Sequence, residues 1–243
     1  YAAHRNLHSF PTRRSSDLQD LTGAVFRIER NIMRNCTLNK SPGDAGHPSN
    51  ALIWANNVFI GAFFGDYHGQ WPLYHVHNTI VVDGPQPVYK LWGRNEGPVF
   101  FENCLVYGRG PASHQVVFQN DKGDPHRYRN LAFDRNVYLV PTPQAWVSGH
   151  GATVPTWEAW RAAENQDAHS ILRPPEPCFA DLDGGDLRPI PGSVAVGAGG
   201  ARFRQPENPL LRVDRDFLGR PRPETPSAGA FEPAIPPPAG AEN

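Results

Sequence analysis

Cysteine, methionine and charged residues are all scarce in this chain of 243 residues. Its three cysteines are an odd number and provide no disulfide framework. No apolar run approaches the roughly 20 residues of a membrane-spanning helix, so the sequence predicts no membrane span. The formal net charge is −1, which argues against nucleic acid or an anionic membrane as the main partner.

Proline and glycine are abundant instead, with 26 and 23 residues, which is too many turns for a helical protein. Hydrophobic residues make up 39% of the chain, enough for one elongated domain with a sizeable core. The composition therefore predicts a globular chain built from short strands and turns.

A short phrase that begins with asparagine recurs four times, at Asn35, Asn56, Asn78 and Asn103. The intervals between the asparagines are 21, 22 and 25 residues. A strand-forming phrase at this period, with Gly and Pro between the copies, predicts a solenoid in which each copy is one stacked rung.

Apolar or β-branched residues flank each asparagine. Two positions before it stand Met33, Trp54, Val76 and Phe101, and two positions after it stand Thr37, Val58, Ile80 and Leu105. Because strand side chains alternate between faces, we expect both columns and the asparagines to face the interior. At about 4.8 Å between rungs, the amides then form a hydrogen-bonded column. The preceding column is expected to face outward: Arg34, Ala55, His77 and Glu102.

These rungs resemble those of the right-handed parallel β-helix superfamily, the pectate-lyase-like proteins, from about Asn31 to Glu232. The C-terminal part is the more specific, because five segments resemble the closing motifs of bacterial secreted β-helix proteins: 177–179, 185–188, 191–199, 216–223 and 229–232. Val194 stands where that family usually has Pro, and Ser227-Ala228 where it usually has Asp-Ile.

The resemblance implies an all-β fold, a right-handed parallel β-helix with a short helix and an irregular C-terminal extension. It also implies a secreted monomer, extracellular or at the cell surface, whose partner is a polysaccharide. The superfamily includes polysaccharide lyases, glycoside hydrolases, epimerases and members without demonstrated activity. The resemblance therefore narrows the substrate class more than the reaction.

The chain divides into four expected segments. Residues 8–18 match the in-frame translation of a common sequencing adapter, so we exclude residues 1–18 from the native fold. Rungs are expected over 19–140, then the C-terminal extension over 141–232, then a Pro-rich disordered tail over 233–243. Since position 1 is not Met, we expect the chain to be the C-terminal part of a longer protein.

Within the extension, a helix is expected near 156–164, with Thr156 as its N-cap and Trp157 and Trp160 on one face. Core packing of these tryptophans is favoured over a sugar-stacking platform. The Cys36 and Cys104 positions are three expected rungs apart, about 14 Å, whereas a disulfide needs Cα atoms within about 7 Å. We therefore expect free, packed thiols.

Chemistry is expected where polar residues cluster, within 61–102. A lyase acting on uronates neutralises a carboxylate with Arg, Lys or Ca²⁺ and removes a proton with a base. Lys90 and Arg94 are the candidates for this work, with His77 as an acid or base. A hydrolase needs two carboxylates, and the candidates by residue type are Asp66 with Asp83, or Glu96 with Glu102.

An exposed patch completes the candidate site. His75 and His77 are two apart on an expected strand and hence on one face, and Glu102 aligns with His77 one rung on. We expect His75, Glu102, Asp66 and His68 to contact substrate, and we assign no metal ligand.

The sequence thus predicts a secreted protein that degrades polysaccharide, with a lyase favoured over a hydrolase. The alternative is a non-catalytic β-helix that binds glycan or serves as a surface scaffold.

Overall fold

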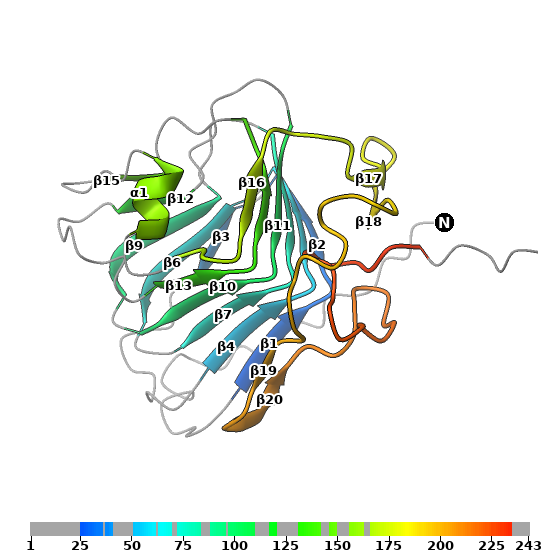
Figure 1. Ribbon diagram of the computed structural model, residues 1–243. Coiled ribbons are helices and arrows are strands. Elements are labelled where there is room, and N and C mark those ends of the chain that lie inside the picture. Colours follow the sequence, from blue (N-terminus) through cyan, green and yellow to red (C-terminus); the bar gives the residue numbers. More distant parts are fainter. Residues whose placement is uncertain are drawn as a thin grey trace, which may run out of the picture.

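The structure is a computed structural model, and strands dominate it (Figure 1). It describes residues 25–35, 37–40, 51–61, 63–69, 72–83, 88–95, 97–109, 117–120, 131–141, 146–149, 156–162 and 166–234. The expected adapter segment, Cys36 and residues 235–243 of the expected tail lie outside this part of the chain.

Two large parallel sheets contain most of the strands. Sheet 1 contains β1 (Val25–Glu29), β4 (Ala51–Ala55), β7 (Leu73–Val76), β10 (Val99–Glu102) and β13 (Leu131–Asp134). Sheet 2 contains β2 (Ile32–Arg34), β5 (Val58–Ile60), β8 (Thr79–Val82), β11 (Leu105–Gly108), β14 (Val137–Leu139) and β16 (Ile171–Arg173).

Smaller sheets complete the fold. Sheet 3 contains β3 (Thr37–Lys40), β6 (Phe63–Gly69) and β9 (Tyr89–Asn95), and β12 (Val117–Asn120) pairs in parallel with β15 (Val147–Gly149). Two antiparallel hairpins follow the helix α1 (Trp157–Ala162): β17 (Phe179–Asp181) with β18 (Asp186–Pro189), and β19 (Arg204–Gln205) with β20 (Asn208–Arg212). The expectation of a mostly β chain with one short helix is confirmed.

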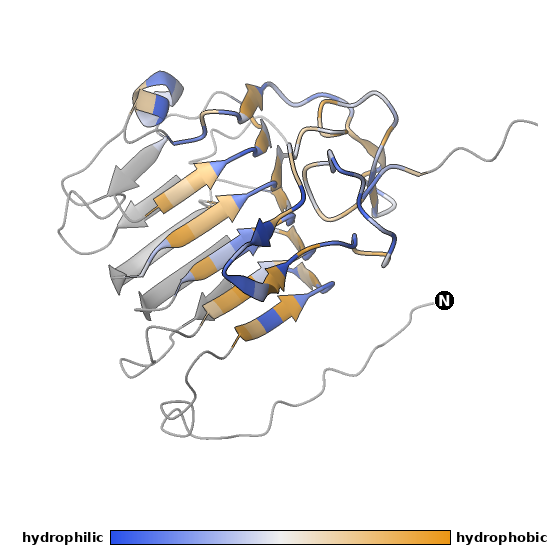
Figure 2. Ribbon diagram, turned by 60° about the horizontal axis from the view of Figure 1, so that its bottom comes forward, coloured by the Kyte–Doolittle hydropathy of each residue, from blue (hydrophilic) through white to orange (hydrophobic). Residues whose placement is uncertain are grey.

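From β1 to β11 the chain visits sheets 1, 2 and 3 in turn and then returns one layer on, so each of these sheets takes every third strand; β16 later follows β14 in sheet 2. Inward side chains of the two large sheets meet in one apolar cluster that includes Trp54, Phe101 and Phe133 from sheet 1 and Phe59 and Val106 from sheet 2. Hydrophobic residues line these strands, and the turns that lead from sheet 1 to sheet 2 are more hydrophilic (Figure 2). Alternation along each strand therefore separates this core from the outer faces.

A tight turn joins sheet 1 to sheet 2 in every layer. Its first residue has a left-handed φ of 54–58°, and the five residues at this position are Arg30, Asn56, His77, Asn103 and Arg135. Asn tolerates this conformation better than most residues, which explains two of the five.

The second turn residue forms a ladder of amides. Asn57, Asn78 and Asn136 each accept a backbone N–H from the layer before, at 2.9–3.1 Å. Each also donates from Nδ2 to a backbone carbonyl of that earlier layer, as Asn78 does to Trp54 at 3.0 Å. The expected column of amides exists, but Cys104 interrupts it, with its Sγ 3.5 Å from the carbonyl of His75.

The expected register is wrong by one residue at several places. Only Asn78 of the four predicted asparagines belongs to the ladder, because Asn56 and Asn103 occupy the turn position before it and Asn35 lies after β2. His75, not Val76, pairs with Trp54 and Phe101. Val76 is buried on the opposite, outer face of sheet 1.

The expected apolar columns are corrected in the same way. Met33 lies in sheet 2, where it pairs with Phe59. Val58 and Leu105 pack on the outer face of that sheet, whereas Ile80 faces the core. The +2 column therefore splits between the two faces.

The C-terminal segment, yellow to red in Figure 1, covers parts of both outer faces. Phe203, Leu211 and Val213 pack with Tyr74 and Val76 on the outer face of sheet 1. On sheet 2 the cover comes from a second set, which includes Phe179, Leu187, Ala195, Ala230 and Phe231.

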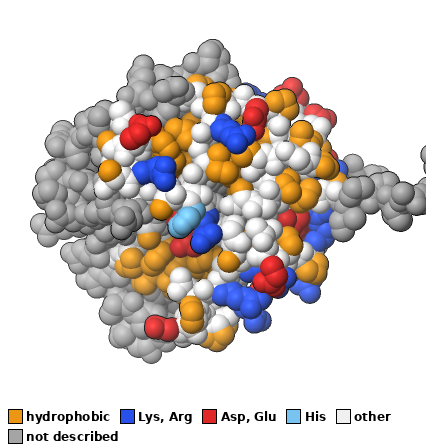
Figure 3. All heavy atoms as spheres, in the orientation of Figure 1, with side chains coloured by type: hydrophobic (Ala, Val, Ile, Leu, Met, Phe, Trp, Pro, Cys, Tyr) orange, Lys and Arg blue, Asp and Glu red, His pale blue; other side chains and the backbone are white. Residues whose placement is uncertain are grey.

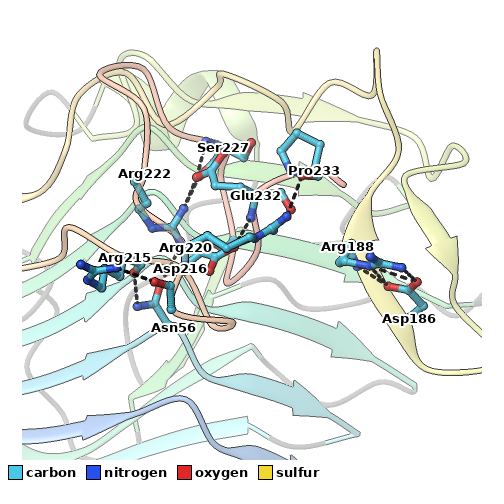
Figure 4. A network of polar contacts seen from close by, with 12 residues as sticks. Asn56, Asp186, Arg188, Arg215, Asp216, Arg220, Arg222, Ser227, Glu232 and Pro233 are labelled. Atoms are coloured by element: carbon cyan, nitrogen blue, oxygen red, sulfur yellow. Dashed lines mark hydrogen bonds and ion pairs between the residues drawn. The ribbon is translucent and has the colours of Figure 1, made fainter. Parts of the chain in front are cut away.

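A buried ionic network anchors this segment to the turns (Figure 4). The Arg222 guanidinium donates to Asn56 Oδ1 at 2.7 Å and to Glu232 Oε1 at 2.5 Å. Glu232 also accepts the Ser227 hydroxyl at 2.8 Å. Burial lowers the pKa of Arg222, and the Glu232 carboxylate opposes that change.

Helix α1 begins as expected, because Thr156 Oγ1 accepts the N–H of Ala159 at 3.1 Å. Trp160 is fully buried, and its Nε1 donates to Asp167 Oδ2 at 2.7 Å. Asp167 also accepts from Asn136 and Tyr138. The helix thereby attaches to the last layers of the large sheets, and the core-packing interpretation of Trp160 is confirmed.

Replacing Arg222 with Met should lower the free energy of unfolding by about 3–5 kcal/mol, because Glu232 is left buried and unpaired. Urea unfolding followed by circular dichroism measures this. Arg188→Met is the matched control, since Arg188 pairs with Asp186 at 2.5 Å on the surface. Equal urea midpoints for the two variants would show that the network does not anchor the segment.

Replacing Cys104 with Asn should raise the free energy of unfolding by about 1 kcal/mol, because an amide completes the ladder between Asn78 and Asn136. Cys104→Ala should lower it by removing packed volume. Thermal unfolding of both variants tests these two expectations. A Cys104→Asn protein less stable than the parent would mean that the thiol site cannot accept an amide.

Candidate functional site

His75, an expected substrate contact, is a core residue. It is fully buried and faces inward, with its ring centroid 6.5 Å from that of Trp54 and 6.0 Å from that of Phe101. The expectation that it lies on an exposed face is wrong, because the one-residue shift in register turns it toward the interior.

His77, an expected catalytic residue, is also fully buried. It occupies the left-handed turn position, and its Nε2 lies 3.3 Å from Asn103 Nδ2. Burial holds the pKa of His77 well below its usual range, and the nearby Arg222 lowers it further. The expected exposed histidine pair is therefore wrong, and His77 belongs to the anchored turns beneath the C-terminal segment.

The other predicted residues lie in different sheets. Lys90 and Arg94 lie on β9, and Asp66 and His68 on β6, where Lys90 pairs with Gly65 and Leu91 with Asp66. Their side chains lie outside the described part of the structure, as does Glu96. Asp83 follows β8 and pairs with Arg109 at 3.5 Å. The described backbone thus separates sheet 3 candidates from Glu102, which lies in sheet 1.

Glu102 pairs in register with Val76 and Asp134 and does not align with His77 as expected. Because Phe101 and Phe133 face the core, Glu102 and Asp134 point to the outer face of sheet 1. Neighbouring strands lie about 4.8 Å apart, so these two side chains leave the sheet side by side. We call Glu102 and Asp134 the carboxylate pair.

His169 fixes one member of the pair. Asp134 Oδ1 accepts the backbone N–H of His169 at 2.8 Å, and Oδ2 lies 2.8 Å from His169 Nδ1. The Arg135 Nε lies 3.8 Å from Oδ2. Burial alone would raise the pKa of Asp134, but the two hydrogen bonds from His169, a backbone hydrogen bond from Arg135 and the electrostatic effect of His169 lower it below its usual value.

Glu102 has the opposite environment. Burial first, and then the negative charge of Asp134, raise its pKa from the usual 4.5 to about 7, while Arg135 opposes the change. Near neutral pH the pair therefore holds one carboxylate that is ionised and one that is partly protonated. Such a division is typical of an acid and a base that work together.

The position of Arg135 depends on Gly200. A Cβ added to Gly200 would lie 1.9 Å from Arg135 Nη1, and the φ of this glycine is +69°. Only glycine fits this close approach without moving the guanidinium. The C-terminal segment thereby helps to place a charge beside the carboxylate pair.

Aromatic rings lie next to the pair on the same outer face. Tyr74 and Phe100 stack with ring centroids 4.7 Å apart and an interplanar angle of 6°. Burial, and then the charge of Glu102, raise the pKa of Tyr74. Figure 3 shows hydrophobic side chains beside histidine, acidic and basic side chains over β10 and β13. Polar and apolar groups thus meet at one surface.

Metal and thiol chemistry find no support among the described residues. No group of three or more His, Cys, Asp or Glu side chains is placed to hold a metal ion in that part of the chain. Cys104 is a buried free thiol, as expected, and Cys178 is another. Burial raises the pKa of these two thiols to about 12 and about 11.

Comparison with known proteins finds no protein-family model that matches this chain and no curated protein that matches it. Within the described residues, no helix is both long and apolar enough to cross a bilayer.

Sequence reasoning missed Asp134, Tyr74 and Phe100. The signal for Asp134 was available, because Asp134-Arg135-Asn136 repeats Glu102-Asn103-Cys104 at 32 residues. Tyr74 and Phe100 carried no such signal, since aromatic residues on strands are equally typical of a core.

Glu102 should make the protein less stable as the pH rises. Between pH 4.5 and about 7 the unfolded chain ionises this residue while the folded chain keeps it protonated. Ionisation therefore stabilises the unfolded state relative to the folded state as the pH rises. The effect amounts to at most about 3 kcal/mol. Glu102→Gln should abolish this part of the decline and be more stable than the parent at about pH 8, measured by urea unfolding. Parallel pH profiles for the two proteins would contradict it.

Proposed function

We propose that this protein is a secreted right-handed parallel β-helix of the pectate-lyase-like type that hydrolyses a polysaccharide on the outer face of sheet 1. The parallel sheets 1, 2 and 3, which the chain visits in turn from β1 to β11, support this architecture. The observation that carries the function is the carboxylate pair, two acids in register on neighbouring strands with pKa values displaced in opposite directions. Monomeric action on an extracellular glycan is part of the proposal.

Glycoside hydrolysis needs these two states of a carboxyl group. Glu102, with a pKa of about 7, is suited to protonate the departing glycosidic oxygen. Asp134 stays ionised and is held by His169, so it is suited to act as the nucleophile or as the base for water. Arg135 favours the ionised form of both acids.

The spacing of the pair bears on the stereochemistry. Retaining enzymes have carboxyl groups about 5–5.5 Å apart, and inverting enzymes about 6.5–9.5 Å. Side chains that leave adjacent strands in register start about 4.8 Å apart. We therefore expect retention, with Asp134 as nucleophile.

Hydrolysis is favoured here over the lyase that the sequence suggested first. A lyase would draw on Lys90 and Arg94, whose strand lies in sheet 3, and on His77, which is buried. The members of the carboxylate pair, by contrast, lie side by side and half-buried on one outer face of sheet 1. The non-catalytic alternative remains an outcome of the experiment below.

Glu102→Gln and Asp134→Asn should each lower the rate of polysaccharide hydrolysis at least about a hundredfold, the usual contribution of a general acid or base. Reducing-sugar release from neutral and uronate polysaccharides measures the rate. Glu29→Gln is the matched control, because Glu29 occupies the same outer column of sheet 1 in the first layer. It should leave the rate unchanged.

Three results would contradict the proposal. Equal losses in all three variants would indicate a general effect on the fold. Products with ultraviolet absorbance from a new double bond would identify a lyase. Glycan binding without turnover in the parent would establish the non-catalytic alternative.

A further inference from the structure

One outer column of sheet 1 runs beside the carboxylate pair. In register across the five strands it contains Arg27, Ile53, Tyr74, Phe100 and Ala132. Because Phe100 and Glu102 are two apart on β10, they share a face and lie about 7 Å from each other. Ala132 and Asp134 have the same relation on β13. The column therefore follows the carboxylates at a constant distance.

A stack of aromatic rings follows this column and ends at Phe100. Phe203 of the C-terminal segment packs on Tyr74 with ring centroids 5.7 Å apart, and Tyr74 stacks in parallel on Phe100. The next position in the column is Ala132, whose side chain is a single methyl group. Phe100 is only partly buried, although one of its faces is covered by Tyr74.

Among the residues that the structure describes, no further ring continues this stack past Phe100, so the position over Ala132 could receive a ring from a ligand. A pyranose ring presents an apolar C–H face, and stacking at about the strand spacing would seat it on Phe100 above the Ala132 methyl. Its next glycosidic bond would then lie toward Glu102 and Asp134. Aromatic residues that shape such sites combine apolar contact with a fixed orientation.

The charges around this position favour a sugar without a carboxylate. Two carboxylic acids on the same face, Glu102 and Asp134, each lie two residues from the column, on the strands of Phe100 and Ala132. His169 Nδ1 and Arg135 Nε lie 2.8 Å and 3.8 Å from Asp134 Oδ2, so both basic side chains are already placed at the carboxylate pair. A uronate at this position would be repelled by the pair.

We infer that Phe100 and Ala132 form a binding subsite for a neutral pyranose next to the carboxylate pair. The inference rests on the proposed function for its reaction, but the subsite is defined by the ring stack and its end at Ala132. It names the substrate class as a neutral polysaccharide.

Binding is best measured on the Glu102→Gln protein, so that the sugar is not consumed. Isothermal titration calorimetry with tetrasaccharides of glucose, galactose, xylose and mannose gives the affinities, with tetragalacturonate as the anionic probe. Phe100→Ala should weaken binding of a neutral tetrasaccharide about tenfold, the order expected for one stacking contact.

Ala132→Phe provides a second variant that removes no core packing. It should continue the stack, occupy the subsite and weaken binding at least about tenfold while circular dichroism stays that of the parent. Ile32→Ala is the control, because Ile32 is an exposed apolar side chain on sheet 2. It should leave the affinity unchanged.

The inference is overturned if no neutral probe binds, if tetragalacturonate binds as tightly as the best neutral probe, or if Phe100→Ala and Ala132→Phe bind like the parent. Turnover assays separate this failure from that of the proposed function. If hydrolysis depends on Glu102 but binding does not depend on Phe100, only the subsite is contradicted. If binding depends on Phe100 but hydrolysis does not depend on Glu102, only the carboxylate mechanism is contradicted.

Discussion

Strands of sheet 1 pair in parallel and in register from one layer to the next, so a residue always has an equivalent neighbour about 4.8 Å away. This repetition is why amides form a ladder, why Tyr74 stacks on Phe100 and why Glu102 meets Asp134. The same repetition limits the directions in which a side chain can point. A side chain on a strand faces either the core or the outer surface, and a slip of one residue exchanges the two.

The turn between sheets 1 and 2 maintains that register. A left-handed residue turns the chain from sheet 1 into sheet 2, and the amide that follows binds the layer before it. Buried amides need partners, and the ladder supplies them without water. The same turns receive the C-terminal segment, because Asn56 binds Arg222 through Oδ1 and the carbonyl of Arg215 through Nδ2. Layer stacking and C-terminal cover are therefore coupled at one line of residues.

The parallel strands were predictable from the sequence because the asparagine phrase and its spacing are local signals. The register was not, since pairs such as Asn56-Asn57 offer two adjacent choices and the ladder uses the second. That single step placed Val76 in the core and His75 outside, the reverse of the structure. Glu102 was identified as a site residue, but its partner Asp134 was not. The burial of His77 depends on a segment about 150 residues away, which no local pattern reveals.

The outer column from Glu29 to Asp134 shows how the cover determines the site. Where Phe203, Leu211 and Val213 cover the sheet, the column contains Ala55 and Val76. Where that apolar cover ends, the column contains Glu102 and Asp134. Covering the two acids as fully would require desolvating both charges, which costs far more than apolar burial gains. Partial cover is sufficient to raise the pKa of Glu102 while His169 and Arg135 keep Asp134 ionised. The limit of the C-terminal cover thus sets both the place of the carboxylate pair and the difference between its members.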